Sequence, residues 1–234
     1  LSTAGLKILR LEGGYKAFRQ NGSQLFSRSH PLLMVTGKTG SGKTQILQSL
    51  AQAGQNIIDL EQLANHRGSA FGGIDMPPQP SQEHFENLLA FQLAEILDGQ
   101  IWVEGESRCI GKVRIPDDFF TQMQNCASIQ IELYLPSRVH RVLEEYGYYD
   151  PQMLREKTQS ITKRMGGDRV KICLEALERS DMQAWVIPLL EYYDKTYLHS
   201  IESRKIPPLK LNIDGLTTDE IISEIILYGK NASA

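Results

Sequence analysis

The chain has 234 residues and a mass of 26.4 kDa, enough for one large domain or for one domain with a smaller helical annex. Apolar residues make up 41% of the chain and charged residues 23%, a composition that excludes a disordered protein. The formal net charge of −3 excludes a protein that is basic throughout, but it allows a local basic face for nucleic acid.

No apolar run approaches the roughly 18 residues that a membrane helix needs, and no signal-peptide pattern is visible. The three cysteines lack metal-site spacing and argue against a disulfide scaffold. We therefore expect a cytoplasmic protein that does not associate with membranes; the sequence does not fix its oligomeric state. The chain begins with Leu1 rather than Met, which indicates a processed product or a fragment.

The first residues predict a strand at 6–11, a glycine turn, a short helix at 15–19 and a polar linker at 20–29. Apolar runs predict the remaining strands, at residues 31–35, 56–60, 101–103, 129–135 and 209–213. Apolar residues at helical spacing predict helices at 44–53, after the capping residue Ser81, through most of 136–205, and at 217–227.

Strands and helices alternate over most of this order. Such alternation predicts an α/β fold, a P-loop doubly wound parallel sheet of about five strands. The helices of residues 136–205 are expected to form a lid or annex on this sheet.

A glycine-rich segment provides the strongest motif, because it fits the phosphate-loop pattern G-x-x-x-x-G-K-[ST] in full. It follows a predicted strand and precedes a predicted helix, and its residues are Gly37, Lys38, Thr39, Gly40, Ser41, Gly42, Lys43 and Thr44. Glycines let successive N–H groups point at phosphate oxygens, and the helix adds its positive dipole end. Lys43 supplies a cation for the terminal phosphate and Thr44 a hydroxyl ligand for Mg²⁺.

Acidic side chains near the ends of two strands are candidates to complete a magnesium site. Glu104 and Glu106 follow the strand at 101–103, and Asp59 ends the strand at 56–60. The alternative is that these carboxylates lie in solvated loops. The Asn-Lys-x-Asp segment of GTPases is absent from the sequence.

Further polar residues are candidate substrate contacts. Glu61, His66 and Arg67 follow the strand predicted at 56–60, at the edge where doubly wound proteins place ligand groups. Arg67 is also a catalytic candidate, together with Lys43 and Thr44. Arg138 and Arg141 share a helix face, where they suit either a phosphate clamp or solvent. A basic run could meet a nucleic-acid backbone, although a solvated charge run is the more common case: Lys163, Arg164, Arg169 and Lys171.

Several stretches together resemble one family, the bacterial tRNA 2-selenouridine synthases. They are the phosphate loop and the residue ranges 59–69, 79–83, 102–108 and 192–194, of which 59–69 is the most specific. Residues 9–19 resemble the last strand and helix of the rhodanese domain that precedes the P-loop domain in that family. The resemblance therefore implies a rhodanese-like remnant at 1–22 and a P-loop domain at 23–234, with the catalytic rhodanese cysteine upstream of this chain.

The family resemblance implies a transferase that acts on the wobble uridine of tRNA. It converts 2-thiouridine into S-geranyl-2-thiouridine with geranyl diphosphate, and then into 2-selenouridine with selenium from selenophosphate. The resemblance adds Arg108 to the substrate-binding candidates and names tRNA and the rhodanese domain as partners. Two alternatives remain: an ATP-dependent small-molecule kinase, and a non-catalytic module that binds nucleotide or tRNA.

Overall fold

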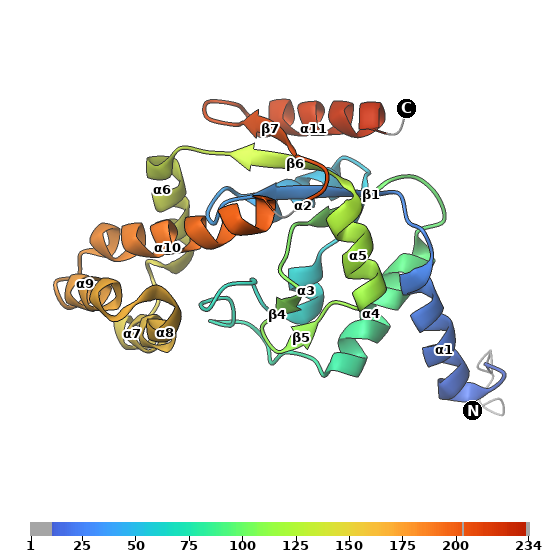
Figure 1. Cartoon of the computed structure of the whole chain (residues 1–234), viewed down its shortest axis with the longest axis horizontal. Helices are drawn as coiled ribbons and strands as arrows, with labels where there is room; N and C mark the ends of the chain where they lie inside the picture. Colours follow the sequence, from blue (N-terminus) through green and yellow to red (C-terminus); the bar gives the residue numbers. More distant parts are fainter. Residues whose placement is uncertain (1–10, 203, 233–234) are drawn as a thin grey trace, which may run out of the picture.

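The computed structural model describes residues 11–202 and 204–232, and its centre is a five-stranded parallel sheet (Figure 1). The strand order is β2-β3-β1-β6-β7, and every neighbouring pair is parallel. The strands are β1 (Leu32–Gly37), β2 (Asn56–Ile58), β3 (Ile101–Glu104), β6 (Ala127–Glu132) and β7 (Leu209–Asn212). The predicted α/β fold with a parallel sheet of about five strands is confirmed. The strand predicted at residues 6–11 lies outside the described residues, apart from Leu11.

Helices cover both faces of the sheet and also form a separate group at one end. Those around the sheet are α2 (Lys43–Gln52), α3 (Leu60–Ala64), α4 (Gln82–Glu95), α5 (Asp117–Asn125) and α11 (Thr218–Ala232), and α1 (Gly14–Ser27) packs on α4 and α5. The annex consists of α6 (Leu135–Tyr146), α7 (Pro151–Ser160), α8 (Thr162–Met165), α9 (Gly167–Glu178) and α10 (Met182–Glu202). None of these described helices is both long and apolar enough to cross a bilayer.

The continuous apolar run of β1 is explained by burial on both faces. Leu32 and Met34 point into a core shared with α1, α3, α4 and α5. Leu33 and Val35 point the other way, into a core shared with α2 and α11. Successive side chains of a strand alternate between faces, so β1, which is covered on both sides, is apolar at all four of these positions.

The annex has its own core, built around Trp185 of α10. The indole Nε1 donates to Thr158 Oγ1 at 3.0 Å, and this hydroxyl donates to the Leu154 carbonyl at 2.7 Å. The annex helices are separated at Asp150, which caps α7 at Pro151, and at Gly167, where α9 starts. In Figure 1, α10 runs from this annex back to the central sheet.

The linker predicted at residues 20–29 is wrong, because α1 continues to Ser27. Phe26 is buried in the core, and its carbonyl accepts from Gln122 Nε2 at 2.8 Å. Residues 20–27 are mostly polar because most of α1 is exposed. The single buried aromatic residue, Phe26, does not give an apolar pattern from which a helix could be predicted. The boundary predicted at residue 22 falls inside this helix, and the assignment of 1–22 to a rhodanese-like domain stays a prediction.

Two further elements lie between β3 and β6 and were not expected. One is the antiparallel hairpin of β4 (Cys109–Ile110) and β5 (Val113–Arg114), and the other is helix α5. The hairpin is only two residues long on each side, which is too short to give an alternating pattern in sequence.

Candidate functional site

The phosphate loop connects β1 to α2 at the carboxyl edge of the sheet. Gly42 caps α2 with φ +85°, and a side chain there would collide with Arg141 of α6, whose Nη1 donates to the Ser41 carbonyl at 3.1 Å. Only glycine combines this left-handed backbone with so close an approach. The loop therefore leads directly into the N-terminus of α2, which carries the positive end of the helix dipole.

Lys43 and Thr44, at the start of α2, both reach Glu104 at the end of β3. Lys43 Nζ lies 3.5 Å from Glu104 Oε1, and Thr44 Oγ1 donates to Glu104 Oε2 at 3.0 Å. Parallel pairing of β1 with β3 brings these segments together, since both strands end at the same edge. Burial lowers the pKa of Lys43, but the negative charges of Glu104, Glu106 and Glu61 outweigh it and leave the pKa raised.

Three carboxylates gather beside Thr44. One carboxylate oxygen from each of Glu61, Glu104 and Glu106 lies within 4.8 Å of the others, and Glu61 Oε2 accepts from Thr44 Oγ1 at 3.4 Å. Burial raises the pKa of all three, and the charge of Glu104 raises the pKa of Glu61 and Glu106 further. Buried like charges at this spacing favour either a shared proton or a bound cation.

Gly68 closes one side of this acidic group. Its φ is +69°, and an added Cβ would lie 2.6 Å from Glu106 Oε2 and 2.8 Å from Glu61 Oε1. The glycine-rich loop 66–73 thus passes directly over the carboxylates. The sequence segment 59–69, which carried the family resemblance, supplies both Glu61 and Gly68.

Asp59 has a different place from the one expected. Its Oδ1 accepts from the Gln62 amide at 2.8 Å and caps α3, and Asp59 is not a member of the group of three acids. Glu61, predicted as a substrate contact, lies beside Thr44, and its contact with a substrate stays a prediction. The residues after β2 are Asp59, Leu60 and Glu61, so the sequence offers two acids near the end of this strand. The helix that begins at Leu60 decides which of them faces the phosphate loop.

Arg138 supports the phosphate loop, which differs from the expected contact with substrate. The side chain is buried, and it forms a bidentate ion pair with Asp194 of α10 at 2.8 Å for both oxygens. Arg138 Nη1 also donates to the Thr39 carbonyl at 3.2 Å, and Lys38 Nζ lies 3.4 Å from Asp194. Asp194 thus holds the loop to the annex through two cations.

Arg67 and Arg141, by contrast, line a cavity in front of the loop, as expected of substrate contacts. Arg67 pairs with Glu145 at 3.3 Å and lies 6.0 Å from the centre of the Tyr146 ring. Its pKa is raised, because hydrogen bonding and acidic neighbours outweigh burial.

His66 and Arg108 are not among the residues that line this cavity. Arg108 pairs with Asp117 and packs over the Phe120 ring on the exposed side of α5. Burial lowers the pKa of His66, and the charge of Lys157 adds to this effect.

The cavity has a volume of about 770 Å³ and joins two chemically different walls. One wall consists of the phosphate loop, the three acids and the arginines. The other is largely apolar and was not predicted; α6, α10 and loop 66–73 supply Phe71, Val142, Tyr146, Trp185, Val186, Leu189, Leu190 and Tyr193. Charged and apolar groups therefore meet in one space.

Comparison with known proteins identifies the family. The tRNA 2-selenouridine synthase AAA domain matches residues 30–212. The tRNA 2-selenouridine synthase of Nitrosomonas europaea is 34% identical over 89% of this chain and 67% of its own length. The synthase of Sulfurovum sp. is 35% identical over 86% of this chain and 64% of its own length. The chain belongs to the tRNA 2-selenouridine synthase family.

The chain spans about two thirds of the length of these synthases, and the family match covers the sheet, the phosphate loop and the annex. Among solved structures, a gluconokinase from Sinorhizobium meliloti is 13% identical and covers 87% of this chain and 94% of its own, with a TM-score of 0.41. That likeness is too low to support an argument.

Some cavity residues of this synthase family member could have been found from the sequence. Trp185, Val186, Leu189 and Leu190 repeat at the spacing of one helix face, and Asp194 extends the same helix by about one further turn. The pattern gives a buried face, but it cannot say that this face borders the phosphate loop. That contact depends on the direction in which α10 returns to the sheet.

Proposed function

We propose that this chain carries the geranyl diphosphate-binding and geranyl-transfer part of a tRNA 2-selenouridine synthase. The overall reaction would convert wobble 2-thiouridine into 2-selenouridine through S-geranyl-2-thiouridine. Family membership and the printed name of the relatives support the class of enzyme and tRNA as its substrate. One observation supports the geranyl step: a phosphate loop and an apolar wall line the same cavity.

The polar wall suits the diphosphate. Loop amides, Lys43 and Arg141 offer donors and positive charge to its oxygens. These groups would bind the leaving diphosphate more tightly as the allylic carbon–oxygen bond breaks and negative charge builds on it. Arg138, held by Asp194, would keep the loop in the binding conformation.

The group of three acids fits Mg²⁺. Carboxylate oxygens and the Thr44 hydroxyl are ligands of the kind that Mg²⁺ prefers, and a bound cation would offset the cost of keeping these buried carboxylates charged. Glu61, Glu104, Glu106 and Thr44 would hold the ion, with Asp59 fixing the start of α3. Bound there, Mg²⁺ would neutralise charge on the diphosphate.

The apolar wall suits the geranyl chain. Phe71, Leu189 and Leu190 line the cavity and are each about 5% exposed or less, so a chain in contact with them would lie against a wall that is already shielded from water. Burial of apolar surface stabilises such a complex by about 25 cal/mol per Å². Exclusion of water also protects the allylic carbon from hydrolysis.

In the proposed step, a lone pair on the sulfur of 2-thiouridine forms a bond to C1 of the geranyl group. The C1–O bond breaks and its electron pair leaves with the diphosphate; loss of the N3 proton of the base then restores neutrality. Soft sulfur is already a good nucleophile, so none of the described residues is assigned as a strong base. The later replacement of the geranylthio group by selenium stays a prediction from the family resemblance, and no described residue is assigned to it.

Calorimetric titration with geranyl diphosphate and, separately, with ATP, each with Mg²⁺, tests the proposal. We expect micromolar binding of geranyl diphosphate, and geranylation of tRNA bearing 2-thiouridine that is lost in Lys43→Ala while the protein stays folded. ATP turnover with no affinity for the prenyl diphosphate would favour the kinase alternative. Binding of nucleotide or tRNA with no turnover would favour the non-catalytic module.

A further inference from the structure

The annex carries a concentration of positive charge that the proposed transfer step does not use. Residues 151–171 contain six basic and two acidic residues, although the whole chain has 25 basic and 28 acidic residues. The basic residues lie on α7, α8 and α9: Arg155, Lys157, Lys163, Arg164, Arg169 and Lys171. Outside this segment the chain is therefore more acidic than its net charge of −3 suggests.

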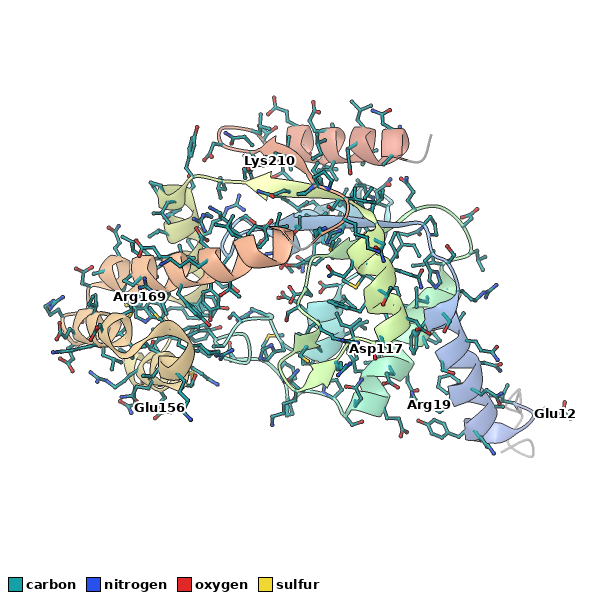
Figure 2. All side chains as sticks on the ribbon, in the orientation of Figure 1. Glu12, Arg19, Asp117, Glu156, Arg169 and Lys210 are labelled. Atoms are coloured by element: carbon teal, nitrogen blue, oxygen red, sulfur yellow. The ribbon has the colours of Figure 1, made fainter. Side chains whose placement is uncertain are left out.

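Four of these six cations have no ion-pair partner among the described residues. Arg155 pairs with Glu178 at 2.7 Å and Lys171 approaches Glu175 at 3.9 Å. The other four are Lys157, Lys163, Arg164 and Arg169, which we call the cationic surface of the annex. Lys163 and Arg164 are exposed, and Lys157 and Arg169 are half-buried. Figure 2 shows Arg169 at the annex end of the molecule, far from α1.

This cationic surface borders the mouth of the cavity. Arg164 itself lines the cavity, and its charge acts on the hydroxyl of Tyr193 in the apolar wall. Lys157 is close enough to His66, at the start of loop 66–73, for its charge to lower the pKa of the imidazole. Positive charge therefore extends from the entrance of the cavity over α7 and α8 to the start of α9.

We propose that the cationic surface of the annex binds the phosphate backbone of the tRNA and so presents the wobble base to the cavity. The inference rests on the proposed function, which names tRNA as substrate. Exposed cations free of internal carboxylates are what a phosphodiester backbone requires, because each contact releases counterions from the nucleic acid. A backbone held outside the mouth leaves an unstacked base free to enter.

The acidic remainder of the chain supports this choice of surface. Elsewhere on the described surface, several exposed basic side chains are already paired with carboxylates: Arg108 and Arg114 with Asp117, and Lys210 with Glu132. A protein with a net negative charge repels the phosphates of RNA, so it needs a local surface of positive charge to bind RNA. The annex provides such a site next to the cavity in which transfer would take place.

The test replaces the three cations that do not line the cavity, in the variant Lys157→Gln/Lys163→Gln/Arg169→Gln. Its matched control replaces three exposed lysines elsewhere, Lys112→Gln/Lys205→Gln/Lys230→Gln, and so removes the same charge. Binding of tRNA is measured by filter retention between about 50 and 200 mM salt, and binding of geranyl diphosphate by calorimetry.

We expect the annex variant to bind tRNA at least tenfold more weakly at low salt. The slope of log K against log salt should become shallower by about two, since each lost phosphate contact removes about 0.7 to 0.9. The control should keep the slope of the parent chain, and both variants should bind geranyl diphosphate unchanged. An annex variant with the parent's affinity and slope would overturn the inference alone, and so would an equal loss in the control. Failure of the parent chain to bind tRNA would overturn the proposed function as well.

Discussion

Arg138 of α6 and Asp194 of α10 form a bidentate ion pair, with 2.8 Å between each nitrogen and oxygen, next to the Thr39 carbonyl of the phosphate loop. Two annex helices are thereby joined to the loop that would hold the diphosphate. Replacing Asp194 with Asn leaves the buried guanidinium without its counter-charge. We expect Asp194→Asn to lower the free energy of unfolding by about 3 kcal/mol and to weaken diphosphate binding.

A double variant separates charge from packing at this pair. Arg138→Met/Asp194→Leu removes both charges, so it should be more stable than Asp194→Asn in chemical denaturation, while diphosphate binding stays weak. A double variant no more stable than the single one would show that the pair contributes by shape rather than by charge.

Gly68 is expected to be intolerant of any side chain. Gly68→Ala places a methyl group less than 3 Å from the Glu61 and Glu106 carboxylates, on a backbone with φ +69°. We expect a loss of about 1–2 kcal/mol of stability and at least a tenfold loss of Mg²⁺-dependent binding of geranyl diphosphate. Gly73→Ala is the control in the same loop, because its Cβ would make only ordinary contact with His66 at 3.4 Å. Equal effects in both variants would contradict a specific role for Gly68.

The acidic group predicts an unusual pH dependence. Because burial and the charge of Glu104 raise the pKa of Glu61 and Glu106, the folded chain keeps protons that the unfolded chain releases. Without Mg²⁺, the free energy of unfolding should therefore fall as the pH rises from about 5 to about 8, by up to about 1.4 kcal/mol per pH unit for each retained proton. Lys43, Asp59 and Glu104 face the same group and are unchanged in the comparison.

Thermal unfolding of the parent chain and of Glu61→Gln/Glu106→Gln, followed over this pH range, measures the effect. The double variant should show a flatter pH profile, and Mg²⁺ should stabilise the parent more at pH 8 than at pH 5, because the ion competes with protons. A parallel profile in the two proteins would mean that these carboxyls do not retain protons on folding.

If the apolar wall binds the geranyl chain, a substitution there should change the affinity for geranyl diphosphate but not the affinity for inorganic diphosphate. Leu189→Ala removes cavity-lining surface from α10, so geranyl diphosphate should bind about tenfold more weakly while inorganic diphosphate binds unchanged. Leu177→Ala removes an equally buried residue of the annex core that does not line the cavity. That control should lose stability but keep the ratio of the two affinities; calorimetry with both ligands decides.

Much of this architecture follows from local signals in the sequence. The phosphate loop, its flanking β1 and α2, the cap at Ser81 and the closing helix follow from glycine spacing and apolar periodicity, and the structure confirms them. The same holds for Glu104, because a residue at the end of a neighbouring parallel strand must lie near the loop.

Other parts depend on contacts between distant segments and leave no local trace. Arg138 and Arg141 share a helix face, yet one supports the loop by pairing with Asp194 and the other lines the cavity. Asp59 and Glu61 are two residues apart, and only the capping of α3 by Asp59 turns Glu61 toward Thr44. The continuation of α1 to Ser27 similarly depends on a single aromatic anchor, Phe26.

Helix α10 carries Leu189 and Leu190 in the apolar wall. About one turn further on it carries Asp194, which pairs with Arg138 and so supports the phosphate loop. Both features belong to one helix, so α10 itself sets the spacing between the apolar wall and the phosphate loop. A redesign for longer or shorter prenyl donors would have to change the size of individual side chains on α10. Shifting or rotating the whole helix would also move Asp194 and break its contacts with the phosphate loop.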